Sequence, residues 1–254
     1  TILTVLDVGF MVRTKGLRRA LLRFFWLTLP CRMAGQITVI SEATRAELMK
    51  WVRISGEKVT VIPVFVSEAF SPAETTSKFD EERPIILQVG TKPNKNLERV
   101  IESLAGRSCL LDIVGILSEG QKKLLSYHNI NFRNCVGLEE AGIVAKYREC
   151  DLVVFASTYE GFGMPILEAQ ATGKAVVTSN ILSMPEVGGE GACYVDPFCV
   201  NSIRAGIDRI VVDPDYREGL VRKGFANVRR FSRKSIAADY MNLYQRMRGK
   251  AGES

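Results

Sequence analysis

Short apolar runs rich in β-branched residues alternate with stretches of helical periodicity along most of this chain. The runs fall at residues 85–89, 110–114, 130–136, 152–155, 175–178 and 192–195, and the helical stretches at 97–105, 119–127, 139–149, 164–171, 200–212, 217–230 and 233–248. A short continuous apolar run suits a strand that is buried on both faces of a sheet. Strands that alternate with helices pair in parallel. The pattern therefore predicts an α/β fold with a doubly wound, Rossmann-like parallel sheet.

The alternation predicts one Rossmann-like domain over residues 68–232, a length within the usual range of single domains. Residues 1–67 are too few for a second domain of that kind, and the chain begins at Thr1 in an apolar, strand-like run. We therefore expect a partial N-terminal Rossmann-like domain with its linker at 1–67, and a final helix and tail at 233–254. We also expect about a hundred residues to be missing before Thr1, as the size of a complete domain requires.

Composition fits a globular α/β protein, with 46% hydrophobic and 24% charged residues and no low-complexity tract. The six cysteines form no C-x-x-C pair and fall mostly in apolar runs, so we expect reduced core thiols rather than disulfides or metal ligands. They are Cys31, Cys109, Cys135, Cys150, Cys193 and Cys199. No apolar run has the length of a membrane span and no signal peptide is visible. The sequence predicts a cytoplasmic protein.

Several classes of enzyme are disfavoured by what the chain lacks. The only histidine, His128, lies in a polar stretch after a predicted helix, so a Ser-His-Asp or Cys-His hydrolase is hard to build, and G-x-S-x-G is absent. Neither a Walker loop nor a complete G-x-G-x-x-G is present, which argues against an ATPase or a simple dehydrogenase. The stretch Asp213-Pro214-Asp215 has the form of a D-x-D metal motif, but its place between two helices favours a helix cap.

A glycine-rich turn carries two carboxylates, in the segment EGFGMPILEA at residues 160–169. It follows the predicted strand at 152–155, which places Glu160 at the carboxyl end of that strand. Gly161 and Gly163 let the backbone approach a ligand, and the free N–H groups at the start of the next helix favour a phosphate. Glu168 is expected in the first turn of that helix, where it can accept hydrogen bonds from hydroxyl groups of the ligand. Alternatively, Glu160 is a solvated loop charge and Glu168 only complements the helix dipole.

This Glu-x7-Glu segment resembles the signature of retaining glycosyltransferases of the GT-B fold, in particular family 4, the glycosyl transferases group 1. Three further segments resemble the same family in order and spacing: VGTKPNKNL at 89–97, SMPEVGG at 183–189, and SEAT at 41–44. The resemblance covers nearly the whole chain. It implies two Rossmann-like domains, of which the C-terminal one binds the nucleotide-sugar donor, and residues 1–67 resemble the end of the acceptor domain and the linker.

The resemblance also implies roles for residues of the donor site. Lys95 would neutralise the leaving diphosphate, a kind of electrostatic stabilisation that is often the largest catalytic contribution. Glu168 would bind the ribose hydroxyls, and Glu160 the hydroxyls of the transferred sugar. The remaining donor-binding positions are Gly90, Thr91, Lys92, Leu138, Gly161, Phe162, Gly163, Met164 and Pro165, with Leu138 against the base and the N–H groups of Gly163 and Met164 on sugar or phosphate oxygens.

The reaction implied is transfer of a sugar to an acceptor hydroxyl with retention of anomeric configuration, in which the leaving phosphate helps to take the acceptor proton. The family is generally metal-independent, so no metal and no cofactor is expected. GDP-mannose and UDP-sugars are the donor candidates by resemblance.

Three positions depart from the family pattern. Leu6 precedes Asp7 where many members have a histidine that contacts the sugar, and Val64-Phe65 follows Ile62-Pro63 where asparagine with glycine or proline is usual. Thr91 stands where an arginine is common. The first departure leaves open a non-catalytic protein that binds a nucleotide sugar. A GT-B nucleotide-sugar epimerase is a further alternative, although the combined motifs favour transfer.

Positive charge is concentrated at the two ends of the chain. Residues 1–32 hold six basic and one acidic side chain, and residues 217–250 hold ten basic and two acidic ones. On a helix, Arg18, Arg19 and Arg23 face one side, and Leu17, Leu21, Phe24 and Phe25 face toward the other.

That pattern suits an interfacial helix on anionic lipid, or equally an amphipathic helix packed within its domain. We hypothesise a lipid-linked acceptor, as in polysaccharide or glycolipid assembly, and a peripheral position at the inner face of the membrane. No interleaving of basic and aromatic residues points to nucleic acid.

Overall fold

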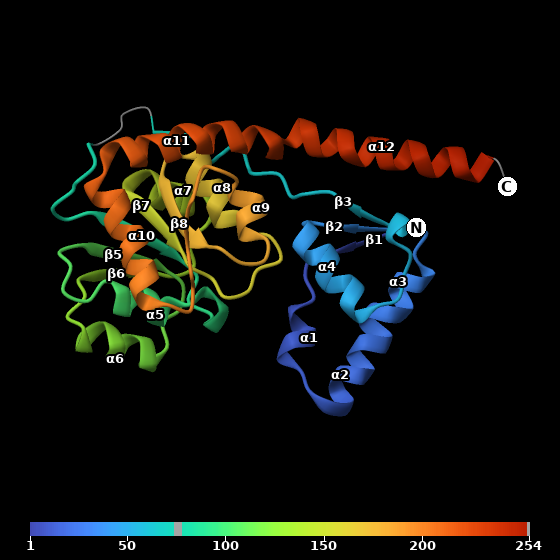
Figure 1. The fold of residues 1–254 in the computed structure, drawn as a ribbon, viewed down its shortest axis with the longest axis horizontal. Coiled ribbons are helices and arrows are strands. Elements are labelled where there is room, and N and C mark those ends of the chain that lie inside the picture. Colours follow the sequence, from blue (N-terminus) through green and yellow to red (C-terminus); the bar gives the residue numbers. More distant parts are fainter. Residues whose placement is uncertain (74–77, 253–254) are drawn as a thin grey trace. The chain divides into compact units, whose positions relative to one another are not determined.

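The computed structural model describes residues 1–73 and 78–252, and the chain divides into two compact units (Figure 1). The first unit comprises Thr1–Phe65, Glu160–Phe162 and Arg230–Ser254. The second comprises Val66–Tyr159 and Gly163–Arg229. Each unit has its own parallel sheet.

The second unit is built on a six-stranded parallel sheet in the order β6-β5-β4-β7-β8-β9. Its strands are β4 (Ile85–Val89), β5 (Leu110–Val114), β6 (Phe132–Cys135), β7 (Leu152–Phe155), β8 (Ala175–Ser179) and β9 (Cys193–Val195). From β4 the chain adds β5 and then β6 on one side. It then crosses to the other side of β4 and adds β7, β8 and β9 there. This is the doubly wound order, which confirms the predicted fold class and creates a switch point between β4 and β7.

Helices connect these strands. They are the 3-10 turn η3 (Pro93–Lys95) and the α-helices α5 (Leu97–Ser103), α6 (Glu119–Tyr127), α7 (Glu140–Glu149), α8 (Met164–Ala171), α9 (Met184–Gly188), α10 (Val200–Val212) and α11 (Pro214–Val228). Asp213 caps α11, because its carboxylate accepts a hydrogen bond of 2.9 Å from the N–H of Tyr216. The cap interpretation of Asp213-Pro214-Asp215 is therefore confirmed. It also explains why α11 begins at Pro214, earlier than the predicted start at residue 217.

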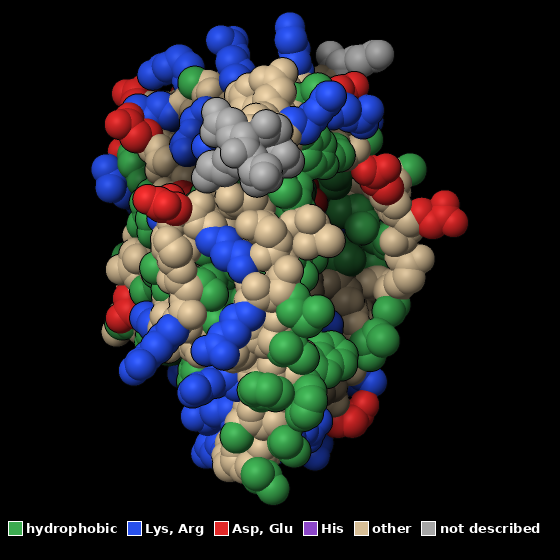
Figure 2. All heavy atoms as spheres, turned by 90° about the vertical axis from the view of Figure 1, so that its right-hand side faces the viewer, with side chains coloured by type: hydrophobic (Ala, Val, Ile, Leu, Met, Phe, Trp, Pro, Cys, Tyr) green, Lys and Arg blue, Asp and Glu red, His purple; other side chains and the backbone are tan. Residues whose placement is uncertain are grey.

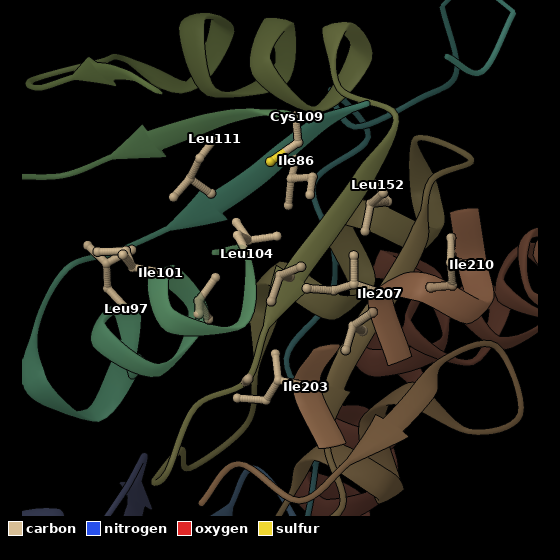
Figure 3. Close-up of a cluster of buried hydrophobic side chains, with 14 of the residues drawn as sticks. Ile86, Leu97, Ile101, Leu104, Cys109, Leu111, Leu152, Ile203, Ile207 and Ile210 are labelled. Atoms are coloured by element: carbon tan, nitrogen blue, oxygen red, sulfur yellow. The ribbon is translucent and has the colours of Figure 1, made fainter. Parts of the chain in front are cut away.

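The core of the second unit lies where α5 and α10 cover one face of the sheet. Figure 3 shows side chains of these helices, such as Ile101 and Ile207, beside the strand residues Ile86, Leu111 and Leu152. All five are fully buried. Burial of this kind contributes about 1.5–3 kcal/mol for each large aliphatic side chain.

The first unit has a three-stranded parallel sheet in the order β1-β2-β3, with strands Ile2–Val5, Gln36–Val39 and Val59–Val61. Its helical segments are α1 (Gly9–Arg13), α2 (Gly16–Leu22), the π-helical turn η1 (Arg23–Thr28), α3 (Leu29–Met33), α4 (Glu42–Trp51), the 3-10 turns η2 (Gly56–Lys58) and η4 (Arg229–Phe231), and α12 (Arg233–Gly252). Met11, Ile37 and Leu48 are fully buried in its core. The last helix packs through Ile236 and Leu243 on Ile62.

Four of the six cysteines follow the expectation of reduced core thiols. Cys31, Cys109, Cys150 and Cys193 are buried free thiols, Cys135 is half-buried, and Cys199 is exposed. Among residues 1–73 and 78–252, no helix combines the length and the apolar character needed to cross a membrane.

Candidate donor site

The candidate site lies in the second unit, at the carboxyl ends of β4 and β7. These neighbouring strands flank the switch point, and loops that leave a sheet there on opposite sides open a crevice in which α/β proteins bind their ligands. The loop after β4 carries Gly90 to Asn96, and the loop after β7 runs into α8.

Lys95 is positioned by the tight turn after β4. Gly90 has a φ of +93°, and a Cβ at this position would lie 2.9 Å from Lys95 Cγ, so glycine leaves room for the lysine stem. The buried Gln88 donates from Nε2 to the carbonyl oxygens of both Gly90 (3.2 Å) and Lys95 (3.1 Å). The ammonium nitrogen then lies 4.7 Å from the ring centroid of Phe155, at the end of β7.

Two asparagines join the loops at the switch point. Asn94 accepts a hydrogen bond from the N–H of Thr158 at its carbonyl (2.8 Å) and donates from Nδ2 to the carbonyl of Tyr159 (3.0 Å). Asn96 is buried with a left-handed φ of 60°, and its Nδ2 donates to the carbonyls of Ala156 (2.8 Å) and Pro197 (2.7 Å). Asn96 therefore ties the loops after β4, β7 and β9 to one another.

Glu168 lies on α8, but not where the sequence analysis placed it. The helix begins at Met164 and has no acidic residue in its first turn, so Glu168 belongs to the second turn and the predicted first-turn position is wrong. Gly163, with a φ of +112°, turns the chain into the helix one residue earlier. The dipole of α8 acts mainly on its first turn, so it does not explain this glutamate.

A buried tyrosine holds the Glu168 carboxylate. The hydroxyl of Tyr147, on α7, donates a hydrogen bond of 2.7 Å to Glu168 Oε2, and the Tyr147 side chain is fully buried. The Phe70 ring packs edge-on against the Tyr147 ring, at 5.5 Å between centroids. Burial raises the pKa of Glu168, while the Tyr147 hydrogen bond and the Lys95 charge act to lower it. Burial and the adjacent carboxylate raise the pKa of Tyr147 well above its ordinary value, so its hydroxyl remains a donor.

The residues Glu160, Gly161 and Phe162 group with the first unit. The carbonyl of Gly161 accepts hydrogen bonds from the hydroxyls of Ser41 (2.7 Å) and Thr44 (2.9 Å), at the start of α4. A methyl group on Gly161 would overlap the carbonyl oxygen of Leu6, so only glycine fits there. The joint action of Glu160 and Glu168 on one ligand stays a prediction.

Phe162 is buried edge-on against Phe231, with 5.8 Å between the ring centroids. Pro165 is buried and Met164 half-buried at the start of α8.

The remaining predicted donor residues line the loops of the second unit. Thr91 donates from its hydroxyl to the carbonyl of Ile116, which joins the loops after β4 and β5. Lys92 is exposed in the same loop. Leu138 is half-buried after β6 and packs close to Gly142 at the start of α7.

Sequence reasoning missed three supporting residues, Gln88, Asn96 and Tyr147. Their roles depend on contacts with other loops or helices. Asn96 lies within the VGTKPNKNL segment at 89–97, but Gln88 and Tyr147 lie outside every motif quoted above. For Asn96 a signal existed, because asparagine directly before a helical stretch is a frequent left-handed residue.

The second unit therefore brings together a cation at Lys95, the N-terminus of α8, and an oriented carboxylate at Glu168. The first two suit a diphosphate and the third suits paired hydroxyl groups. Across residues 1–73 and 78–252, no group of three or more His, Cys, Asp and Glu side chains has the arrangement of a metal site.

Comparison with known families is consistent with this chemistry. Residues 72–226, more than half of the chain, match the family model described as "Glycosyl transferases group 1". The O-antigen chain mannosyltransferase B of Escherichia coli is 38% identical over 99 residues, which cover 39% of this chain and 26% of that protein.

Another curated relative is the MMP alpha-(1->4)-mannosyltransferase of Mycolicibacterium hassiacum. It is 27% identical over 231 residues, which cover 85% of this chain and 55% of that protein. In these two comparisons the matched region is thus a quarter to just over half of the relative's length.

Among solved structures, the fold is similar to that of Anabaena HepE in complex with UDP-glucose. The TM-score is 0.81 at 16% identity, and the match covers 96% of this chain and 71% of that one.

Proposed function

Because this chain belongs to the glycosyl transferases group 1 family, we propose that its second unit is the nucleotide-sugar donor site of a glycosyltransferase. The observation that carries the proposal is the grouping of Lys95, in the loop after β4, with Glu168 on α8 and the Tyr147 hydroxyl that holds it from α7. A lysine or a glutamate alone would not indicate a ligand-binding site. A carboxylate fixed by a buried tyrosine, within electrostatic reach of a lysine at a switch point, supports a site built for a ligand with hydroxyls and phosphates.

In the proposed reaction, the bond between the anomeric carbon and the diphosphate oxygen breaks, and the acceptor oxygen bonds to the same carbon with retention of configuration. The acceptor proton passes to the leaving phosphate, so no protein base is needed. Lys95 stabilises the negative charge that develops on the diphosphate. Glu168 accepts hydrogen bonds from the ribose hydroxyls and fixes the nucleotide. The reaction is expected to need no metal ion.

Glu160 is proposed to contact hydroxyls of the transferred sugar, and the N–H groups of Gly163 and Met164 to contact sugar or phosphate oxygens. Leu138 would pack against the base. Gly90, Thr91, Lys92, Gly161, Phe162 and Pro165 would shape the surrounding loops.

The donor is proposed to be a GDP- or UDP-sugar. Two relatives are named mannosyltransferases and a structural neighbour was solved with UDP-glucose, which supports this class. The name of the O-antigen relative supports a role in polysaccharide or glycolipid assembly.

A lipid-linked acceptor and a peripheral position at the inner face of the membrane are also proposed. The support is the exposure of Leu17, Leu21, Phe24 and Phe25 next to a basic sequence in the first unit. Absence of binding to anionic liposomes at low salt would contradict this part.

A non-catalytic nucleotide-sugar-binding protein is the second candidate. Leu6 favours it, because this side chain is exposed at the position where many family members carry a histidine that contacts the sugar. Measuring sugar transfer and nucleotide binding on the same preparation separates the two candidates, since a non-catalytic protein would bind without turnover.

Calorimetric titration of the chain with UDP, GDP and ADP tests the donor site. We expect one nucleotide to bind in the micromolar range, and Glu168→Ala and Lys95→Ala each to weaken it about tenfold or more, as for loss of a charge-assisted hydrogen bond. Lys123→Ala, at an exposed position on α6, is the matched control. Binding of the three nucleotides with no preference, or equal binding by all variants, would contradict the proposal.

A further inference from the structure

Basic side chains make up four of the six residues that line a hollow of about 400 Å³ on the first unit. We call it the basic hollow, and its lining residues are Arg23, Thr28, Arg32, Lys50, Trp51 and Arg53. No carboxylate is among them. The hollow belongs to the first unit alone, so it is separate from the donor site.

The path of the chain explains how these residues meet. The segments α2, η1 and α3 follow one another with helical backbone at their junctions. In a π-helical turn, residues i and i+5 lie one above the other, so Arg23 and Thr28 share a face of the helix. Arg32 lies on the same face, one α-helical turn after Thr28. The other wall comes from the end of α4, with Lys50 and Trp51, and from Arg53 just beyond it.

The charge of the hollow is largely uncompensated. Lys50 pairs with Glu47 at 2.5 Å. Within the part of the chain that the structure describes, the guanidinium groups of Arg23, Arg32 and Arg53 form no ion pair. Like charges that line one hollow repel each other. A bound anion would be attracted to all of them and would offset this repulsion.

The chemistry of the lining points to an acceptor-rich ligand. Guanidinium and ammonium groups offer only hydrogen-bond donors, and a phosphate offers acceptors with the geometry that arginine matches best.

The surface beside the hollow indicates what carries the phosphate. Phe24, Phe25, Trp26 and Met33 are 51%, 57%, 74% and 74% exposed on the same helical run, and we call them the apolar strip. Figure 2 shows hydrophobic side chains and Lys and Arg side chains gathered next to each other at the end of the first unit where α2 lies. Exposed aromatic groups beside basic ones suit the boundary between lipid headgroups and acyl chains.

We propose that the basic hollow binds the phosphate of an anionic membrane lipid while the apolar strip enters the headgroup region. The inference deepens the membrane part of the proposed function and rests on it. It is independent of the donor site, because nucleotide binding is measured separately.

Vesicle co-sedimentation of the full-length protein tests the proposal, with phosphatidylcholine vesicles that contain or lack phosphatidylglycerol. We expect binding only with phosphatidylglycerol, and expect Arg32→Gln and Arg53→Gln each to weaken it about fivefold, the effect of one basic residue at an anionic surface. The matched control is Arg248→Gln, at an exposed position on α12 of the same unit and outside the lining of the hollow. Thermal unfolding of each variant checks that the fold is kept.

The outcomes separate the possibilities. Loss confined to the hollow variants supports the proposal. Equal losses for Arg248→Gln and Arg32→Gln would mean general charge attraction and would overturn it. If soluble pyrophosphate at low concentration displaces the protein from vesicles completely, the hollow is a free-phosphate site and the lipid assignment is wrong. Failure of the unmodified protein to bind either vesicle overturns this inference and the membrane proposal together, while a nucleotide titration on the same sample still reports on the donor site.

Discussion

The hydroxyl of Tyr147 lies 2.7 Å from Glu168 Oε2, so that one carboxylate oxygen is held by a fully buried donor on the neighbouring helix. The bond fixes the direction of the carboxylate and leaves Oε1 for other partners. An oriented carboxylate binds paired hydroxyls better than a mobile one, because less side-chain freedom is lost on binding.

Tyr147→Phe should weaken UDP or GDP binding about three- to tenfold without a change in fold, as expected for loss of about 0.7–1.4 kcal/mol of hydrogen-bond energy. The loss should vanish with the 2′,3′-dideoxy form of the same nucleotide, which has no ribose hydroxyls for Glu168. Calorimetry on both ligands measures this. Tyr127→Phe, at an exposed position on α6, is the control. An equal loss for both ligands would show a general structural effect and contradict a positioning role.

The Glu168→Gln variant should become more stable relative to the unmodified protein as the pH rises. Burial raises the pKa of Glu168 in the folded protein above the ordinary value of 4.5, so the folded state holds its proton more tightly than the unfolded state does. Ionisation of Glu168 therefore lowers the free energy of unfolding of the unmodified protein as the pH rises from about 4.5 to the raised pKa of the folded state. Urea unfolding at about pH 4 and about pH 7 should show a larger gain for the glutamine variant at the higher pH. Glu119→Gln, exposed on α6, should show no such trend.

Gly161→Ala should destabilise the first unit by about 1–3 kcal/mol, the usual cost of an added methyl group in a filled space. The methyl would lie 2.9 Å from Asp7 Cβ and closer still to the Leu6 carbonyl oxygen. Thermal unfolding measures the loss. Gly219→Ala is the matched control, because nothing lies within 4 Å of a Cβ there and alanine suits a helix better. Equal melting temperatures for both variants would refute the prediction.

Asn96→Ala should cost about 2–4 kcal/mol, because it leaves the carbonyls of Ala156 and Pro197 without their donor and places alanine at a φ of 60°. Asn96→Gly removes the backbone cost and keeps the loss of the donor, so it should recover only about 1 kcal/mol. At the exposed Asn129, with a φ of 51°, alanine should cost only the backbone term. Urea unfolding of the three variants separates the two contributions, and similar losses for alanine at both positions would argue against the bridging role of Asn96.

The architecture could be predicted because local sequence patterns mark its strands and helices. Buried parallel strands appear as continuous apolar runs, and α8 was predicted to its exact bounds because Pro165 and Gly163 mark its start. The first-turn position of Glu168 was wrong although the start of the helix at Met164 was predicted, because Glu168 is the fifth residue from that start and lies in the second turn.

The hydroxyl groups that hold Gly161 could not be foreseen as partners. Ser41 lies 120 residues away in the sequence, and only folding brings it to that carbonyl. The SEAT segment was recognised as a motif, but the sequence alone does not state what its hydroxyls bind. The same is true of Tyr147, whose partner lies on another helix.

The single amide of Asn96 connects three loops, and this bears on how the site can change over evolutionary time. Loops that share one buried donor open together, so their backbone amides should exchange with solvent as one cooperative group rather than separately. An insertion in any one of them would disturb the other two. New ligand preferences in such a site are therefore reached by exchanging the side chains that project from the loops, while the loop lengths stay constant.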